Sequence, residues 1–165
     1  GGAGAGELDA WPAGGRTDGG AGDDSLLGGW GDDSLAGGAG SDVLHGGAGA
    51  DVVDGRAGEA TAEADYLNGG EGDDLMRAGA GDRANGGSGA DTFALDAGED
   101  GPAVIEDFDP DEDAILLEYD GTGPVPDVWT GVAEGGTGIW VDGTLIATLP
   151  GIEALAPAQI RLAAV

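Results

Sequence analysis

The chain has 165 residues, including 38 glycines and no cysteine, and its 33 acidic residues against five basic ones give a net charge of −28. This balance excludes nucleic acids and anionic membranes as partners, because both require a basic face. The lack of cysteine excludes disulfides and zinc–thiolate sites. High charge with little apolar surface is typical of disorder unless the charge is neutralised. Divalent cations are the obvious neutralising agents, so the charge itself indicates metal.

A nine-residue repeat occupies the first half of the chain. The pattern is G-G-x-G-x-D-x-U-x, where U is a large apolar residue, and it occurs four times in tandem, at residues 19–27, 28–36, 37–45 and 46–54. Two further units, 69–77 and 86–94, follow it as well. The remaining units keep the spacing but depart from the pattern: 1–9, 10–18, the long unit 55–68 and the short unit 78–85.

The repeat predicts a solenoid of short strands. Positions seven to nine form a strand whose alternation directs position eight inward. The other six residues turn the chain, since glycine tolerates the positive φ angles of a tight loop. Two units complete one right-handed coil, so loops stack on their second neighbours about 4.8 Å apart. The predicted buried line is Leu8, Thr17, Leu26, Leu35, Leu44, Val53, Leu67, Met76, Ala84 and Phe93.

The stacked loops predict calcium sites. Calcium takes six to eight oxygen ligands, including carboxylates and backbone carbonyls, and each loop offers a carboxylate at position six and carbonyls exposed by glycine. Counting stacked consensus loops gives four to six ions; the long loop that ends at Asp65 is the variable part of this count. The predicted metal-binding residues are Gly19, Gly20, Ala21, Gly22, Asp24, Gly28, Gly29, Trp30, Gly31, Asp33, Gly37, Gly38, Ala39, Gly40, Asp42, Gly46, Gly47, Ala48, Gly49, Asp51, Asp65, Gly69, Gly70, Glu71, Gly72, Asp74, Asp82, Gly86, Gly87, Ser88, Gly89 and Asp91.

This nonapeptide resembles the RTX (repeats-in-toxin, haemolysin-type) calcium-binding family. The resemblance covers residues 19–94 strongly and residues 1–18 weakly. It implies an all-β fold, a right-handed parallel β-roll over residues 1–94 with calcium in its loops. It also implies the C-terminal module of a bacterial protein exported by type I secretion, which folds when it meets calcium outside the cell. A flexible glycine-rich linker is the alternative, but linkers have neither a period nor an apolar position in phase with it.

Residues 95–165 predict a C-terminal β cap. The nine-residue period stops, and residues 104–108 and 114–119 have the composition of strands. Residues 105–117 resemble the I-x-D-F…D-x-I-x-L stretch that follows RTX repeats in secreted bacterial proteins. Asp142-Gly143 favours a type I′ turn between two apolar runs, hence an antiparallel hairpin. The tail, residues 158–165, is either a type I secretion signal or an ordinary last strand.

One acidic segment of the cap has the spacing of an EF-hand loop. Asp107, Asp109, Asp111, Asp113 and Glu118 occupy positions 1, 3, 5, 7 and 12 of that motif. Glu112, however, stands where the loop needs glycine, and the flanking residues favour strands rather than helices. The segment is therefore interpreted as a solvated acidic turn, ahead of an incidental surface calcium ion and of a true EF-hand.

The sequence offers little for catalysis, and we predict no enzyme activity. His45 is the only histidine and falls at an outward strand position, and no metalloprotease motif or cysteine nucleophile is present. Trp11, Trp30, Trp129 and Tyr119 could line a sugar-binding face or serve as core and cap contacts.

Two functions remain open. The chain is either the calcium-dependent folding and secretion module of a larger exoprotein or a self-standing structural or adhesive protein of the cell surface. Both place it outside the cell, without membrane insertion. The expected partners are calcium, the type I secretion apparatus, and an upstream catalytic domain or further copies of the chain. The chain begins inside a repeat and without methionine, which predicts that it is part of a longer protein.

Overall fold

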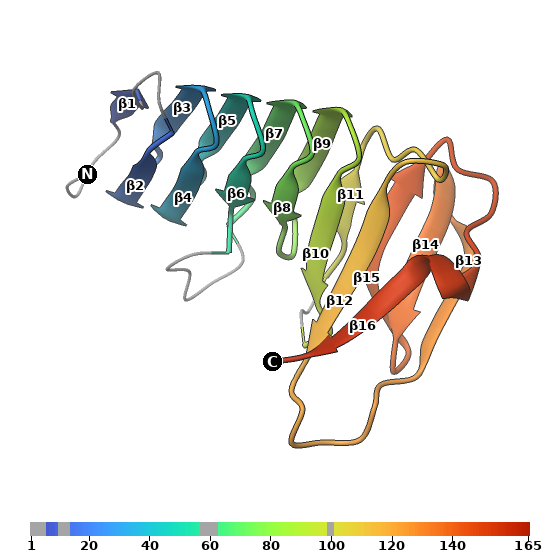
Figure 1. Ribbon diagram of the computed structural model, residues 1–165. Helices are drawn as coiled ribbons and strands as arrows, with labels where there is room; N and C mark the ends of the chain where they lie inside the picture. The colour runs from blue at the N-terminus through green and yellow to red at the C-terminus, as the bar shows by residue number, and fades with distance from the viewer. Residues whose placement is uncertain (1–5, 10–13, 57–62, 99–100) are drawn as a thin grey trace.

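The computed structural model describes residues 6–9, 14–56, 63–98 and 101–165. In this part of the chain the regular structure is two β-sheets and one short 3-10 helix, η1 (Pro157–Gln159) (Figure 1). The first sheet has nine strands in the order β1 (Glu7–Asp9), β3 (Ser25–Trp30), β5 (Val43–Ala48), β7 (Tyr66–Glu71), β9 (Arg83–Ser88), β11 (Ala103–Ile105), β15 (Thr144–Pro150), β14 (Gly136–Val141) and β13 (Val128–Ala133). The second has seven, in the order β16 (Ile160–Ala164), β12 (Ala114–Tyr119), β10 (Thr92–Asp96), β8 (Leu75–Arg77), β6 (Val52–Asp54), β4 (Ser34–Ala39) and β2 (Arg16–Ala21). No helix of these ranges is long and apolar enough to cross a membrane.

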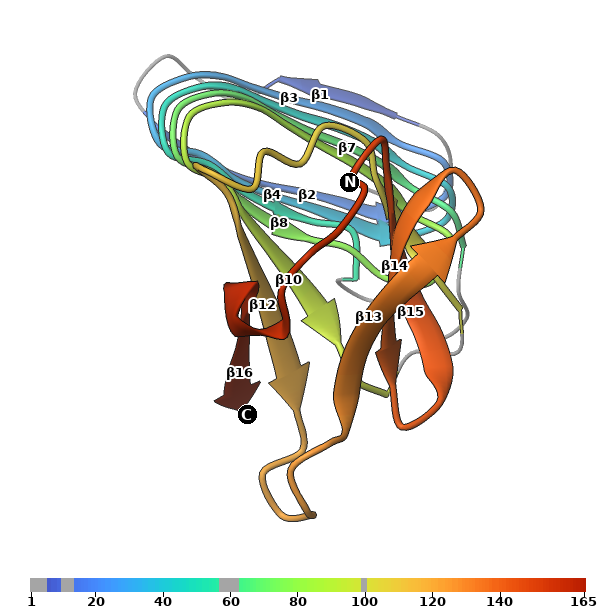
Figure 2. The same ribbon diagram turned by 90° about the vertical axis from the view of Figure 1, so that its right-hand side faces the viewer.

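The repeats form a parallel β-roll of two facing sheets. Strands alternate between the sheets along the chain, and each pairs in parallel with the second strand before and after it. Leu26 pairs with Leu44, and Thr17 with Leu35, so one coil contains two nonapeptides as predicted. Seen along the stack, successive coils superimpose (Figure 2).

The strands are longer than the sequence predicts. The prediction of three-residue strands is right for β6 and β8 but wrong for β3, β4 and β5, which extend through the first three residues of the next repeat. Neighbouring coils have the same backbone conformation there, so even the second glycines pair in register, as Gly29 does with Gly47. The turn is correspondingly three residues, positions four to six, instead of six.

Position eight forms the core of the roll from Leu26 onward, whereas Thr17, which was predicted to be buried, is only half-buried. The buried side chains are Leu26, Leu35, Leu44, Val53, Leu67, Met76, Ala84 and Phe93, all at most 1% exposed. They stack in two ladders, one per sheet, and both ladders continue beyond the repeats: Ala84 pairs with Ile105, and Phe93 with Ile115. Each coil contributes only two of these side chains, so the apolar core is thin.

The C-terminal region extends both sheets instead of lying against them. β11 pairs in parallel with β9, β12 with β10, and β16 with β12. The predicted antiparallel arrangement is therefore found only in β13–β14–β15. The β14–β15 hairpin turns at Asp142 and Gly143, whose φ angles of 49° and 91° are those of the predicted type I′ turn. The tail forms β16, parallel to β12.

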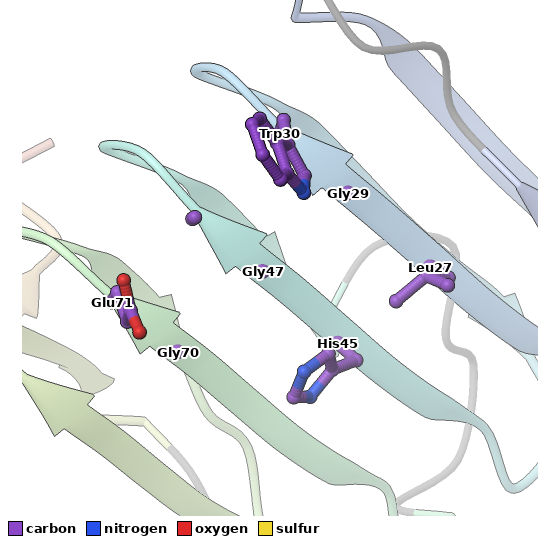
Figure 3. Close-up of a pocket in the computed structure, with 8 residues that line it drawn as sticks. Leu27, Gly29, Trp30, His45, Gly47, Gly70 and Glu71 are labelled. Atoms are coloured by element: carbon purple, nitrogen blue, oxygen red, sulfur yellow. The ribbon is translucent and has the colours of Figure 1, made fainter.

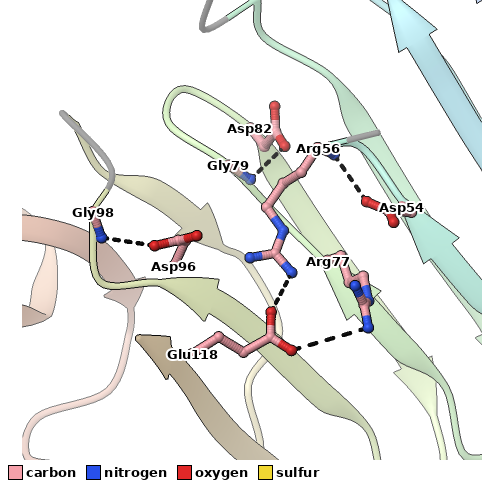
Figure 4. Close-up of polar contacts among 8 residues, drawn as sticks. All are labelled: Asp54, Arg56, Arg77, Gly79, Asp82, Asp96, Gly98 and Glu118. Atoms are coloured by element: carbon pink, nitrogen blue, oxygen red, sulfur yellow. Dashed lines mark hydrogen bonds and ion pairs between the residues drawn. The ribbon is translucent and has the colours of Figure 1, made fainter. Parts of the chain in front are cut away.

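An ion-pair network joins the repeats to this region (Figure 4). Arg56, which follows β6, donates to Glu118 of β12 at 2.7 Å, and Arg77 of β8 lies 4.0 Å from the same carboxylate. The side chains of Arg56 and Glu118 are only 15% and 13% exposed, so this charged hydrogen bond is partly shielded from solvent. The network spans strands β8 and β10 of the second sheet and ties the start of the long unit 55–68 to the cap.

Replacing Gly143 by alanine tests the hairpin turn. A Cβ there would touch nothing within 4 Å, so the only cost is the positive φ angle. We expect a loss of about 1–2 kcal/mol in the free energy of unfolding, measured by thermal denaturation in saturating calcium. Gly123→Ala is the control, because Gly123 has no positive φ and a Cβ there would meet only the Asp120 carbonyl oxygen, at 3.8 Å. Equal stability of the two variants would contradict a type I′ turn.

Candidate metal centre

The position-six aspartates form two buried columns. Each aspartate directly precedes a strand, so the stacking of strands also stacks the carboxylates. The first column precedes strands of the nine-stranded sheet and contains Asp24, Asp42, Asp65 and Asp82. The second precedes strands of the seven-stranded sheet and contains Asp33, Asp51, Asp74 and Asp91. All eight are at most 4% exposed, which is unusual for carboxylates.

One oxygen of each carboxylate links neighbouring coils. Asp42 Oδ1 accepts a hydrogen bond from the backbone N–H of Asp24 at 2.7 Å, and Asp51 Oδ1 accepts one from Asp33 N–H at the same distance. Asp65 accepts in the same way from Asp42 at 2.7 Å, although its loop carries the insertion. From Asp33 to Asp91, each aspartate of the columns is thus oriented by the coil before it.

The second oxygen has no such partner at five positions. Oδ2 of Asp24, Asp33, Asp42, Asp51 and Asp74 is buried and has no hydrogen-bond partner within the described ranges. A buried carboxylate oxygen without a partner carries a large desolvation cost. These atoms are therefore the natural ligands for a cation.

The electrostatics of the columns also favour a cation. Burial raises the pKa of the Asp74 carboxyl to about 7; the hydrogen bond from Asp51 N–H opposes this, and the negative charges of Asp51 and Asp91 add to it. Burial likewise raises the pKa values of Asp42, Asp51 and Asp91. Like charges stacked in a poorly solvated column disfavour ionisation, and a bound cation would reverse this effect.

The first glycine of the repeat leaves room for an oxygen-lined cradle. A Cβ on Gly28 would lie 2.9 Å from Asp33 Oδ2 and even closer to the carbonyl oxygen of Gly46 in the next coil. The same pair of contacts, one carboxylate and one carbonyl from the next coil, surrounds Gly19, Gly46 and Gly69. Oxygens from two coils therefore converge beside these glycines, where any side chain would displace them.

The remaining predicted residues shape the loops. The glycines at positions two and four have positive φ, and a Cβ at position two would collide with the backbone of the preceding coil, as at Gly47 against Gly29. The position-three carbonyls of Ala39, Ala48, Glu71 and Ser88 accept hydrogen bonds from the position-four N–H groups of the preceding coil. Each keeps a second lone pair for a further contact.

Asp82 differs from the other members of its column. Its Oδ1 accepts from Asp65 N–H at 2.9 Å, as expected, but its Oδ2 accepts from Gly79 N–H at 2.7 Å within its own short turn. Both oxygens are thus engaged by backbone, which leaves less capacity for a cation than at Asp24 or Asp51.

Asp113 extends the second column, which the sequence did not reveal. Its Oδ1 accepts a hydrogen bond from Asp91 N–H at 2.9 Å, the same link that joins Asp74 to Asp91. Asp107 adds a second contact, accepting from the N–H groups of Gly86 and Gly87 at 2.9 and 2.8 Å. The only signal was that Asp113 directly precedes a strand, as position six always does.

The EF-hand spacing has no structural counterpart. Its flanks are strands β11 and β12, and Glu118 lies in β12 bonded to Arg56 instead of in the turn. Asp109 N–H donates to Asp113 Oδ2, so these residues form an acidic turn. The expectation that the segment is solvated holds for Asp109 and Asp111, which are exposed, but Asp107 and Asp113 are half-buried contacts to the last repeat.

The aromatic candidates for a sugar-binding face are scattered. Trp11 lies outside the described residues. Trp129 stacks on Trp140 with ring centroids 4.2 Å apart, as a cross-strand pair in the cap. Trp30 and the exposed His45 lie on the outer face of the first sheet, in strands β3 and β5.

The loops fit calcium by donor type. Within the described ranges no three His, Cys, Asp or Glu side chains converge as a ready-made metal cluster. A cation between coils would therefore need backbone carbonyls beside the carboxylates, which is the hard, all-oxygen donor set that calcium prefers. The orphaned Oδ2 atoms and the cradles beside the first glycines supply both kinds of oxygen.

Comparison with known proteins agrees with this geometry. The family model of the RTX calcium-binding nonapeptide repeat matches residues 18–44, 27–61, 59–83 and 82–101, together slightly more than half of the chain. The chain belongs to the RTX calcium-binding nonapeptide repeat family. It is also similar to the AlgE6R3 subunit of the Azotobacter vinelandii mannuronan C5-epimerase, whose solution structure is 31% identical in sequence. That match covers 84% of this chain and 77% of the other, with a TM-score of 0.41. A search of curated proteins found no match.

Proposed function

We propose that this RTX module folds on binding calcium outside the cell and thereby supports the secretion and stability of a larger exoprotein. The observation that carries the proposal is the pair of buried aspartate columns. A thin apolar core faces rows of buried like charges, so the folded roll needs a positive counter-charge within its loops.

The residues that would hold calcium are the two columns with their loop carbonyls. In the first column the consensus pair is Asp24 with Asp42. In the second column Asp33, Asp51, Asp74 and Asp91 form three successive pairs. Calcium would supply positive charge and coordination to oxygens that have no other partner. The chain's own part is to hold these oxygens in register, through the Oδ1 links between coils.

The energies are of the right size. A site saturated a hundredfold above its dissociation constant adds about 2.7 kcal/mol to folding. Four such sites add about 11 kcal/mol, which is comparable to the whole stability of a typical domain, about 5–15 kcal/mol. Metal binding can therefore decide whether the roll is folded at all.

The secreted setting follows from this dependence. A roll that needs calcium stays unfolded where calcium is scarce, as in the cytosol, and folds in calcium-rich medium. An unfolded, strongly acidic chain suits transport by a type I secretion apparatus. The β16 tail would be recognised by that apparatus before the chain folds.

Chelation tests the coupling of calcium to folding. In excess chelator we expect loss of the β-sheet circular dichroism spectrum and of the cooperative melting transition, because the stacked carboxylates repel one another. Calcium should restore both. Magnesium at equal ionic strength is the control, since it demands octahedral geometry and loses its water reluctantly. Equal recovery with magnesium would indicate simple screening, and an unchanged spectrum in chelator would refute the proposal.

The number of bound ions tests the register of the loops. We expect four to six calcium ions per chain in the repeats, measured by elemental analysis after gel filtration and by titration calorimetry. A count of two or fewer would mean that the stacked loops do not share ions in the way the columns imply.

Substituting two aspartates that have the same position in the repeat tests whether calcium ions are shared between successive coils. Asp51 has an aspartate on each side in its column, Asp33 and Asp74, whereas Asp24 faces Asp42 on one side and Gly6 on the other. Asp51→Ala should therefore raise the calcium midpoint for folding by roughly tenfold, the scale of losing a group that supports a metal site. Asp24→Ala should raise it less and release fewer ions.

The two substitutions are matched in burial, because both side chains are at most 4% exposed. Midpoints are measured by circular dichroism against free calcium, and ion counts by elemental analysis. Equal midpoints, or a larger effect at Asp24, would show that ions are not shared between successive coils.

A further inference from the structure

The outer face of the first sheet carries a trough that the calcium sites do not explain. It crosses strands β3, β5 and β7 and is an open groove of about 530 Å³ (Figure 3). Its floor is the row of second glycines, Gly29, Gly47 and Gly70, which lie side by side in register. Its walls are the outward side chains at positions nine and three of the same strands.

The two walls are chemically mixed. One wall is Leu27 and His45, continued in register by Asn68 and Asn85. The other is Trp30, Ala48 and Glu71, continued by Ser88. Along its length the trough thus passes from an aromatic end, through an imidazole and a carboxylate, to amides and a hydroxyl.

Trp30 is the feature that the fold does not require. Position three is alanine, glutamate or serine in the other consensus repeats, and its side chain points to solvent. Trp30 is 76% exposed, a large apolar surface left in water. Leu27, on the opposite wall of the trough, is 44% exposed and is a second apolar group of this face.

We propose that this trough binds a neutral polysaccharide chain lying along the solenoid axis, with a pyranose ring stacked on Trp30. The C–H face of a pyranose is apolar and packs against an indole ring, while its hydroxyls both donate and accept hydrogen bonds. His45 and Glu71 line the trough from its two walls, on the neighbouring strands β5 and β7. An aromatic platform with a few polar groups is the usual composition of a small-molecule site.

Charge selects the class of glycan. With a net charge of −28, and with Glu71 as the acidic group of the trough, the protein repels polyanions such as uronates and sulfated glycans. An uncharged chain meets no such barrier. A trough that crosses three successive coils along a stack of repeats also matches a polymer of repeating units better than a single compact ligand.

Calorimetry with neutral hexasaccharides tests the proposal. The full chain in saturating calcium is titrated with cellohexaose, laminarihexaose, maltohexaose and mannohexaose, and with a hexauronate as the anionic comparison. We expect binding of at least one neutral sugar with a change in tryptophan fluorescence, and none of the hexauronate. Failure of all neutral sugars to bind, or binding of the hexauronate alone, overturns the proposal.

The variants locate the site. Trp30→Ala places at position three the residue that occupies it in three other repeats, and it is compared with wild type at calcium concentrations where both give the same circular dichroism spectrum. The dissociation constant should rise roughly tenfold or more, as expected for loss of an aromatic platform. Trp129→Ala, which removes an exposed tryptophan of the cap, is the matched control and should bind as wild type does.

The other outcomes are decisive as well. Equal binding by Trp30→Ala and wild type would place the sugar elsewhere and overturn the assignment. If wild type binds no sugar and sediments as a dimer that Trp30→Ala makes monomeric, the face is a protein interface and the glycan proposal is wrong. Because every measurement is made in saturating calcium, a negative result leaves the calcium-dependent folding of the module untouched.

Discussion

The repulsion between buried carboxylates is the constraint on which the rest of the structure depends. Two columns of aspartates, each at most 4% exposed, run along the β-roll, and the coil spacing brings like charges close together. Three of the five arginines pair with other carboxylates, Arg56 and Arg77 with Glu118 and Arg83 with Glu106. The hydrophobic core, two side chains per coil, is too thin to outweigh such charges. On the function proposed here, a bound cation offsets this repulsion, and apolar packing and metal ligation then stabilise the same contacts between coils.

The glycines of the repeat follow from the same constraint. The first glycine keeps open the space where a carboxylate oxygen and a carbonyl of the next coil meet, as beside Gly28. The second glycine has positive φ and lies against the backbone of the preceding coil, as Gly47 lies against Gly29. A side chain at the first position would fill the oxygen cradle, and one at the second would force the coils apart. The repeat therefore needs glycine at these positions for close packing between coils as much as for the conformation of the loop.

The buried positions and the hairpin turn were predictable from the sequence because local sequence determines them. The period identified Leu26, Leu44 and Phe93 as buried, and Asp142-Gly143 identified its turn, since each depends on a few neighbouring residues. Asp113 could not be found in this way. Its role is defined by a hydrogen bond from Asp91, 22 residues away, and nothing in its acidic surroundings resembles a repeat. The strand lengths were missed for a related reason: β3 and β5 extend through their glycines by pairing with each other, Gly29 with Gly47, which is a property of the stack.

The apolar core is unevenly distributed along the axis, so the contribution of hydrophobic burial to stability differs from coil to coil. The four tandem repeats at 19–54 bury one apolar side chain each, whereas the cap buries many, among them Ile139, Ile146 and Leu149. Hydrophobic burial alone is therefore strongest at the C-terminal end, where β10, β11 and β12 hold the two sheets in register. Those strands present edges onto which β8 and β9 can pair with their loops already aligned. Moving toward the N-terminus, burial per coil stays small while every coil adds carboxylates. If calcium supports folding as proposed, the balance shifts toward the N-terminus from apolar packing to metal ligation, and the first coils should depend most on the ion and the cap least.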